Sequence, residues 1–354
     1  MRTERFDFPN SDGHLLTAVL HHPDGEPRDY ALFAHCFTCS KDSRAARWIS
    51  ESLAARGIAV IRFDFTGLGS SEGDFANTDF SSNVDDLVAA ADHLRATHRA
   101  PTLLVGHSLG GAAVLSAAGR IAETRAVATI GAPSDPSHVA TLFGEQIDAI
   151  RSRGEGEVEL GGRTFRIRRD FLDDIAEHRL LEQVRTLRKP LLIMHAPTDQ
   201  IVGIDNASAI FAAARHPKSF VSLDDADHLL SRRRDARYAG DVIAAWSQRY
   251  IAAPVDEPAP DGQVVVSETG RGQFQQSVTA GAHHFLADEP TEVGGLDTGP
   301  SPYDLLLAAL GACTAMTLRL YAQRKGLPLD HVSVTLQHSK IHAQDCQTCE
   351  TQQG

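Results

Sequence analysis

The stretch TLLVGHSLGGAAVLSAAGR, residues 102–120, decides the fold because an apolar run leads into a helical pattern through a short glycine-bounded turn. The run TLLV shows no polar alternation, which is typical of a strand buried on both faces of a parallel sheet. GHSLG, Gly106 to Gly110, follows it as a Gly-x-Ser-x-Gly pattern, and its glycines lack the side chains that would collide across a tight turn. The stretch therefore predicts a strand–turn–helix unit that presents Ser108 at the carboxyl end of a parallel strand.

Further apolar runs alternate with helical patterns on both sides of this unit. The runs are residues 31–37, 58–65, 126–132, 190–196 and 219–223, and the helical patterns lie near 43–56, 83–98, 109–124 and 240–251. This alternation predicts an α/β fold with a doubly wound, mostly parallel sheet. Residues 133–188 interrupt it and contain a hairpin that turns at Gly161-Gly162, so we expect a lid there.

The length of 354 residues predicts two domains. Residues 252–262 carry three prolines and three acidic residues without apolar periodicity, which is typical of a linker. We therefore assign residues 1–253 to the first domain, 254–262 to the linker and 263–354 to the second domain. In the second domain, the sequence predicts a β-meander over 264–288, a long helix over 301–326 and a strand over 331–343.

Charge and composition exclude several kinds of partner. The formal net charge of -12 argues against nucleic acid, because phosphate binding needs clustered Lys and Arg. The N-terminus lacks the apolar core of a signal peptide, and no run approaches the roughly 18 apolar residues of a membrane span. Five cysteines form two close pairs and a single, unlike a secreted disulfide framework. We therefore expect a cytoplasmic protein without a membrane partner.

A nucleophilic serine needs a base, and the base needs an orienting acid. Asp199 follows the run 190–196 and His228 follows the run 219–223, so both lie at the sheet edge that carries Ser108. We expect these three residues to form a catalytic triad. Asp135 is an alternative acid, although capping of a lid helix explains it more simply. A serine that only caps a helix is the alternative for Ser108.

Residues 5–252 resemble an α/β-hydrolase with a small lid. Five motifs are similar to the hydrolase half of the bifunctional α/β-hydrolase/OsmC proteins: HCFTCSKD (35–42), RFDFTGLGSSEG (62–73), GHSLGG (106–111), HAPTDQIVGIDNAS (195–208) and DADHLL (225–230). The resemblance implies an oxyanion hole formed by the backbone N–H groups of Leu109 and Phe37. From its place among the glycines of RFDFTGLGSSEG, we also expect Asp64 to shape a glycine-rich turn beneath the site.

These features predict a serine hydrolase that cleaves small-molecule carboxylic esters or thioesters through an acyl-enzyme, with no metal or other cofactor. Acyl transfer or peptide hydrolysis by the same triad is an alternative. A thiol-dependent, hydroperoxide-handling protein that uses the hydrolase fold as a scaffold is another, and a ligand-binding module is a third.

Cys36 and Cys39 form a Cys-x-x-Cys pair in the loop that the resemblance assigns to the oxyanion hole. Three interpretations remain open. The thiols can pack the loop as small apolar side chains, which we favour. They can form a redox switch whose disulfide distorts the loop and stops hydrolysis. They can also bind zinc with the second pair, Cys346 and Cys349, although the domain junction separates the two pairs.

Residues 298–334 resemble the central helix and following strand of OsmC-type proteins, relatives of organic hydroperoxide reductases. The resemblance makes Cys313 a peroxide-attacking thiol, whereas helical spacing alone makes it a buried core residue. Tyr303 replaces a glutamate of the hydroperoxide-reducing branch, and the sequence ends before the helix of the partner cysteine, so we expect no peroxidase turnover. OsmC-type units form intertwined dimers. We therefore expect a homodimer through this part, and an exposed apolar helix face in a single chain.

Overall fold

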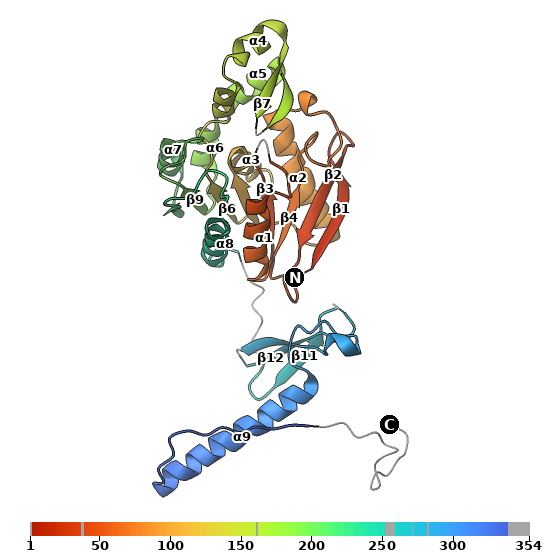
Figure 1. The fold of residues 1–354 in the computed structure, drawn as a ribbon, viewed down its shortest axis with the longest axis vertical. Helices are drawn as coiled ribbons and strands as arrows, with labels where there is room; N and C mark the ends of the chain where they lie inside the picture. The colour runs from red at the N-terminus through yellow and green to blue at the C-terminus, as the bar shows by residue number, and fades with distance from the viewer. Residues whose placement is uncertain are drawn as a thin grey trace. The chain divides into compact units, whose positions relative to one another are not determined.

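The computed structural model describes residues 2–36, 39–160, 162–251, 259–270, 272–281 and 283–338. The chain divides into two compact units, Met1–Val255 and Asp256–Gly354. The two units are coloured red to green and blue in Figure 1.

An eight-stranded sheet forms the centre of the first unit (Figure 1). Its order is β1 (Thr3–Pro9), β2 (Leu15–His21), β4 (Ile58–Phe63), β3 (Asp29–Ala34), β5 (Leu103–His107), β6 (Ala126–Ile130), β9 (Leu191–His195) and β10 (Lys218–Ser222). The strands from β4 to β10 are parallel, and β1 and β2 add an antiparallel edge. All six predicted strands are confirmed, while β1 and β2 were not predicted.

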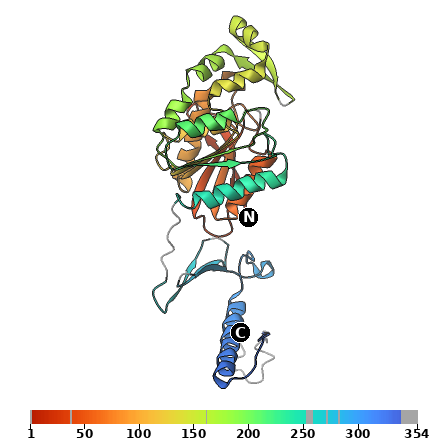
Figure 2. The same cartoon turned by 90° about the vertical axis from the view of Figure 1, so that its left-hand side faces the viewer.

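Helices cover both faces of this sheet (Figures 1 and 2). The helices α1 (Arg44–Ala54) and α8 (Arg233–Ser247) pack on one face, and α2 (Phe80–Thr97), α3 (Leu109–Ala117), α6 (Leu180–Thr186) and α7 (Asp205–Ala213) belong to the other. In β3, Leu32 and Ala34 join one hydrophobic cluster, whereas Ala31 and Phe33 join the opposite one. Burial on both faces explains the unbroken apolar runs and confirms the doubly wound fold.

The predicted lid forms a small layer above the carboxyl end of the sheet, drawn in yellow-green in Figure 2. It contains η2 (Pro136–Phe143), α4 (Gln146–Arg153), β7 (Glu155–Leu160), β8 (Arg163–Arg168) and α5 (Arg169–Glu177). The hairpin of β7 and β8 is confirmed, with Leu160 opposite Arg163. The lid rests on the body of the unit partly through aromatic packing, because Phe165 meets Phe75 of η1 (Phe75–Asn77) edge to face at 5.3 Å.

The second unit begins with an antiparallel meander of β11 (Val264–Glu268), β12 (Gln276–Ala280) and β13 (His283–Ala287), as predicted. After η3 (Thr291–Val293), Ser301 caps the long helix α9 (Pro302–Lys325) through a reciprocal pair of hydrogen bonds with Asp304. The strand predicted over 331–343 was wrong for the described residues 331–338, which form no strand. No strand of the described meander pairs with them, and an alternating pattern alone does not supply a partner.

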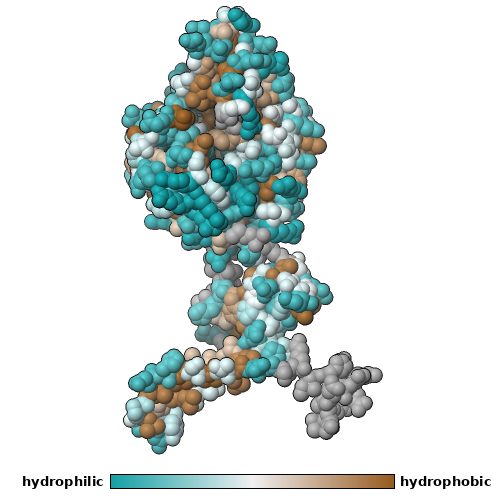
Figure 3. Space-filling model, viewed as in Figure 1, coloured by the Kyte–Doolittle hydropathy of each residue, from teal (hydrophilic) through white to brown (hydrophobic). Residues whose placement is uncertain are grey.

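The apolar stripe of α9 is exposed rather than buried. Leu306, Leu310 and Leu320 are 66%, 57% and 65% exposed, and Cys313 is an exposed free thiol. The core interpretation of Cys313 was therefore wrong, and the exposed apolar helix face expected of a single chain is confirmed (brown in Figure 3). By length and composition alone, α9 also meets the measure of a membrane-spanning helix, with a mean hydropathy of 1.6. The helix carries no unbroken apolar run of that length, because isolated polar residues interrupt it.

Candidate active site

Ser108 stands on a strained turn between β5 and α3. Its backbone angles are φ 56° and ψ -127°, a positive-φ conformation that a residue with a side chain adopts only where its surroundings enforce it. A Cβ atom on Gly106 would lie 2.3 Å from the carbonyl oxygen of Gly110, and one on Gly110 would lie 2.4 Å from that of His35. The two glycines therefore permit the close backbone approach that lifts the serine hydroxyl out of the turn.

The fold brings Ser108, His228 and Asp199 into one line of hydrogen bonds. His228 Nε2 lies 2.9 Å from Ser108 Oγ, and its Nδ1 lies 2.7 Å from Asp199 Oδ2. Asp199 follows β9 and His228 follows β10, so three strand ends contribute one residue each. Asp199 and His228 are almost fully buried, whereas Ser108 is half-buried. This arrangement can move a proton from the hydroxyl to the imidazole while the carboxylate holds the ring.

The carboxylate of Asp199 is fixed on both of its oxygens. Its Oδ1 accepts the backbone N–H groups of Ile201 and Val202 at 2.8 and 3.0 Å, which leaves Oδ2 for His228. Burial alone would raise the pKa of Asp199, but the hydrogen bonds from His228 and the two amides outweigh burial and hold this pKa below its usual range. The carboxylate is therefore ionised at neutral pH.

His107 supports the loop that carries His228. Its Nε2 donates to the backbone carbonyl of His228 at 2.7 Å. Burial, with a smaller contribution from the neighbouring His228 ring, lowers the pKa of His107 to about 4, so the ring is neutral at neutral pH. His107 thus positions the loop and does not contribute a charge.

Leu109 and Asp135 have different structural roles. Leu109 is the first residue of α3, where backbone N–H groups have no partner within the helix. Asp135 caps η2 by accepting the N–H of Ser137 at 2.8 Å, as the simpler interpretation predicted. Phe37, the other expected oxyanion donor, lies outside the described residues.

A cavity of about 200 Å³ opens beside Ser108 and His228. Most of its wall is apolar and comes from α3, the lid and the loops that carry the acid and the base: Leu109, Val139, Leu142, Leu160, Ile201 and Leu229. Among its described lining residues there is no lysine, arginine, aspartate or glutamate. The cavity is therefore suited to an apolar group rather than an acidic one.

A family model of alpha/beta hydrolases matches residues 31–296, and an OsmC-like model matches residues 295–351. The chain belongs to the alpha/beta hydrolase family. The predicted order, a hydrolase followed by an OsmC-like region, is confirmed.

Relatives of the hydrolase part include esterases and thioesterases. The crystal structure of the esterase domain of a Rhodothermus marinus protein is 53% identical, with a TM-score of 0.61, over 71% of this chain and all of that one. A mouse alpha/beta hydrolase domain-containing protein 10 shares the fold at 22% identity and a TM-score of 0.59, over 70% of this chain and 99% of that one. The mitochondrial palmitoyl-protein thioesterase ABHD10 of Rattus norvegicus is 28% identical over 182 residues, 48% of this chain and 59% of that protein's length.

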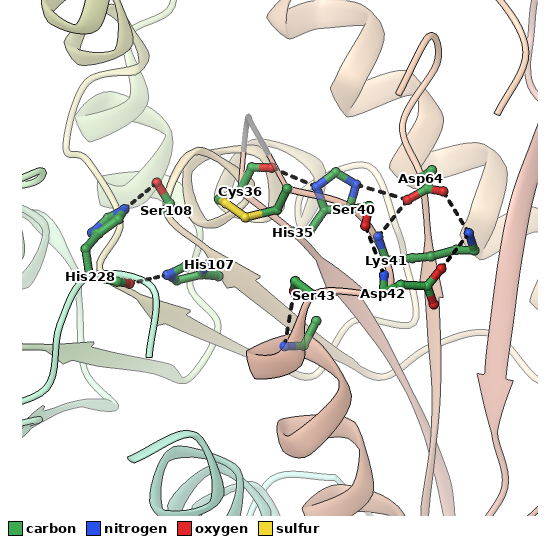
Figure 4. The surroundings of a disulfide bond; sticks show 12 residues. His35, Cys36, Ser40, Lys41, Asp42, Ser43, Asp64, His107, Ser108 and His228 are labelled. Atoms are coloured by element: carbon green, nitrogen blue, oxygen red, sulfur yellow. Dashed lines mark hydrogen bonds and ion pairs between the residues drawn. A yellow bond between two sulfur atoms is a disulfide. The ribbon is translucent and has the colours of Figure 1, made fainter. Parts of the chain in front are cut away.

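The hydrolase carries a disulfide between Cys36 and Cys39, with Cα atoms 5.2 Å apart (Figure 4). The favoured interpretation, two packed free thiols, was therefore wrong, because it ignored that a turn brings this pair together. The N–H of Cys39 donates to the carbonyl of Cys36 at 3.1 Å and closes this turn. The disulfide coexists with the aligned Ser108 and His228, and so does not disrupt these side chains. The proposed zinc partners, Cys346 and Cys349, lie outside the described residues.

A buried ion pair, which was not predicted, anchors the chain just after this disulfide. Asp64 is fully buried and accepts the backbone N–H of Lys41 at 2.6 Å and its Nζ at 2.8 Å. Asp64 also accepts the N–H of Ser70 at 3.0 Å, which agrees with its predicted role in the glycine-rich turn. A lysine in a polar loop gives no sequence signal of burial, so its partner was visible only in three dimensions.

A possible metal-binding group lies among other residues of the hydrolase. Within the described part of the chain, one ligand atom each from Glu4, His22 and His98 lie within 4.8 Å of one another. None of these residues lines the cavity at Ser108, so the group has no part in the chemistry at that serine. The ligands considered from the sequence were the four paired cysteines, and Glu4, His22 and His98 were not among them.

Proposed function

We propose that the hydrolase unit is a serine hydrolase that cleaves carboxylic esters or thioesters. The observation that carries this proposal is the continuous line of hydrogen bonds from Ser108 through His228 to Asp199. His228 Nε2 removes the proton of Ser108 as the hydroxyl oxygen attacks the acyl carbon, and Asp199 stabilises the imidazolium. The alcohol or thiol then leaves with that proton, and the acyl group stays on the serine.

Water completes the reaction by the same route. His228 takes a proton from water as it attacks the acyl-serine, and returns the proton to Ser108 when the acid leaves. The N–H of Leu109 at the start of α3 stabilises the oxyanion in both steps, together with the N–H of Phe37 that the family resemblance implies. Both steps need no other charged side chain, because His228 acts as the base and Asp199 stabilises its protonated form.

The cavity supports a substrate with a short, apolar acyl group. A cavity of about 150 Å³ holds a benzene molecule, so about 200 Å³ accommodates roughly six to eight carbon atoms. An esterase domain and palmitoyl-protein thioesterases are among the relatives, and both activities use the same attack on an acyl carbon. A palmitoyl chain would extend beyond this volume. We therefore propose butyryl to octanoyl esters and thioesters as substrates.

We also propose an oligomeric state and a cellular location for the protein. A homodimer through the OsmC-like part would cover the exposed leucines of α9, and light scattering that gives the mass of a single chain would refute it. A cytoplasmic location rests on the five cysteines, which form two close pairs and a single and do not resemble a secreted disulfide framework. Cell fractionation tests it, and recovery of the protein from the membrane fraction would contradict it.

Hydrolysis of p-nitrophenyl butyrate tests the function. Ser108→Ala should reduce kcat by several orders of magnitude with little change in KM, because the nucleophile is lost while the cavity remains. The matched control is Ser208→Ala, which changes an exposed serine of α7. A fluorophosphonate probe should label the wild type at Ser108, whereas a hydrolase fold that serves only as a scaffold would remain unlabelled. Undiminished hydrolysis by Ser108→Ala would refute the assignment.

A further inference from the structure

The Cys36–Cys39 disulfide lies in the wall of the candidate active site. Cys36 lines the cavity together with Ser108 and His228, and it is only 4% exposed. Figure 4 places it between Ser108 and His35, whose Nδ1 donates to the Cys36 carbonyl at 2.7 Å. Any change in the position of Cys36 therefore changes the wall next to the reacting serine.

The chain is anchored on both sides of the disulfide by other contacts. Before it, β3 leads into Cys36. After it, Lys41 is bound to Asp64 through both its backbone and its side chain. Within the described residues between these anchors, the disulfide and the hydrogen bond from Cys39 to Cys36 are the contacts that hold the turn closed.

A disulfide that closes a ring of only four residues contributes little to the stability of a fold. The entropy that a disulfide removes from the unfolded chain grows with the length of the loop it closes, and Cys36 and Cys39 are separated by only three positions. The disulfide is also unlike a protected structural one, because Cys39 is partly exposed whereas Cys36 is buried. An accessible disulfide with this spacing is suited to thiol exchange.

We propose that the Cys36–Cys39 disulfide is a thiol-exchange site through which a dithiol reductant controls hydrolysis at Ser108, the disulfide form being the active one. This inference rests on the proposed function. It reverses the direction expected from the sequence, in which the disulfide was to stop hydrolysis. The reversal follows from the structure, where the disulfide and the aligned line from Ser108 to His228 occur together.

The exchange consumes one dithiol and transfers two electrons. A thiolate of the reductant attacks the sulfur of the partly exposed Cys39, the sulfur–sulfur bond breaks, and the Cys36 sulfur leaves as a thiolate and takes up a proton. The second thiol of the reductant then attacks the mixed disulfide and releases the thiol of Cys39. The reductant ends as a cyclic disulfide, and the protein ends with two thiols.

Reduction must move the wall of the cavity. Sulfur atoms in any disulfide are about 2 Å apart, whereas non-bonded heavy atoms settle at about 3.5–4.0 Å. The two side chains therefore separate by roughly 1.5 Å, at a position that borders the serine. Because a displacement of about 1 Å in an active site can cost up to a hundredfold in rate, we expect about a tenfold fall in kcat/KM.

The test uses the full chain equilibrated in mixtures of reduced and oxidised dithiothreitol and then desalted. Alkylation and peptide mass spectrometry give the fraction of Cys36 and Cys39 that is reduced, and p-nitrophenyl butyrate gives kcat/KM. The expected result is a loss of about tenfold that follows this fraction and is restored by reoxidation. An unchanged kcat/KM in fully reduced protein, or a disulfide that resists dithiothreitol at neutral pH, would overturn the proposal.

Variants identify the cysteines responsible. The double variant Cys36→Ser, Cys39→Ser should have the low activity of the reduced protein and no response to reductant, with circular dichroism to check its fold. Cys313→Ser, which changes the exposed thiol of the second unit, should respond like the wild type. A double variant that still responds would sink the proposal. Ser108→Ala separates the two hypotheses, because hydrolysis that needs Ser108 but ignores reductant contradicts only the thiol-exchange site.

Discussion

Replacing Asp199 by asparagine tests how the carboxylate orients His228. An asparagine can keep the N–H bonds of Ile201 and Val202 only with its carbonyl oxygen on the side of the present Oδ1. Its NH2 group must then face His228 Nδ1, where the present Oδ2 lies at 2.7 Å. The ring is forced to carry its proton on Nε2, directed at Ser108, and it can no longer accept the serine proton.

We expect Asp199→Asn to lower kcat for p-nitrophenyl butyrate by about 10⁴-fold, the size of effect that a wrong histidine tautomer produces. At 1.36 kcal/mol for each factor of ten, this loss is about 5.4 kcal/mol of transition-state stabilisation. KM should change by less than about threefold, because Asp199 does not line the cavity.

Asp135→Asn is the matched control, since Asp135 was the alternative acid. Asparagine can still accept the N–H of Ser137, so this variant should retain kcat within about twofold. Thermal unfolding of both variants checks that each is folded. A kcat within tenfold of the wild type for Asp199→Asn, or a larger loss for Asp135→Asn, would refute the assignment of the acid.

Three further predictions concern stability and the second unit. Gly110→Ala should lower the free energy of unfolding by about 3 kcal/mol or more, because its Cβ would lie 2.4 Å from a backbone oxygen. The control Gly119→Ala has open space around the new Cβ and should change this free energy by less than about 0.5 kcal/mol. Chemical denaturation measures both. Asp64→Asn should cost about 3 kcal/mol, because the buried ammonium of Lys41 loses its buried carboxylate and keeps only the exposed one of Asp42. Asp42→Asn, which removes only the exposed carboxylate, should cost less than about 1 kcal/mol. The chain should show no peroxide turnover with a dithiol reductant, and consumption that Cys313→Ser abolishes would contradict this.

The parts of the fold that were predictable are those whose burial is uniform. The strands β3, β4, β5, β6 and β9 are buried along their whole length, so each appears in the sequence as an apolar run, and the edge strand β10 is half-buried but still carries the apolar Phe220 and Val221. The edge strand β1 was missed because its exposed residues alternate with half-buried ones and the buried Phe8. Its neighbour β2 is mostly buried, but Thr17 interrupts its apolar run. The strand expected over 331–343 has the right composition, but strand formation needs a hydrogen-bonded neighbour, which composition does not supply to the described residues 331–338.

The candidate site was predictable to the extent that its residues follow strand ends. Ser108, Asp199 and His228 each come directly after a predicted strand, and parallel strands bring their carboxyl ends to one edge. The pair of Lys41 and Asp64 joins two loops 23 positions apart, and neither loop carries a periodic signal. The state of the cysteines was also beyond the sequence, because Cys-x-x-Cys spacing suits packing, redox and metal binding alike.

The reacting groups and part of the cavity wall come from different segments of the chain, and this has an evolutionary consequence. The reacting groups follow the carboxyl ends of β5, β9 and β10, whereas Val139, Leu142 and Leu160 of the cavity wall belong to the lid. Replacing these three side chains by bulkier or smaller ones would alter which acyl lengths fit without touching the proton-transfer geometry. Lineages that share this scaffold can therefore diversify their substrates by drift in the segment 136–160, and an engineer could graft that segment from one homologue to another to transplant chain-length preference.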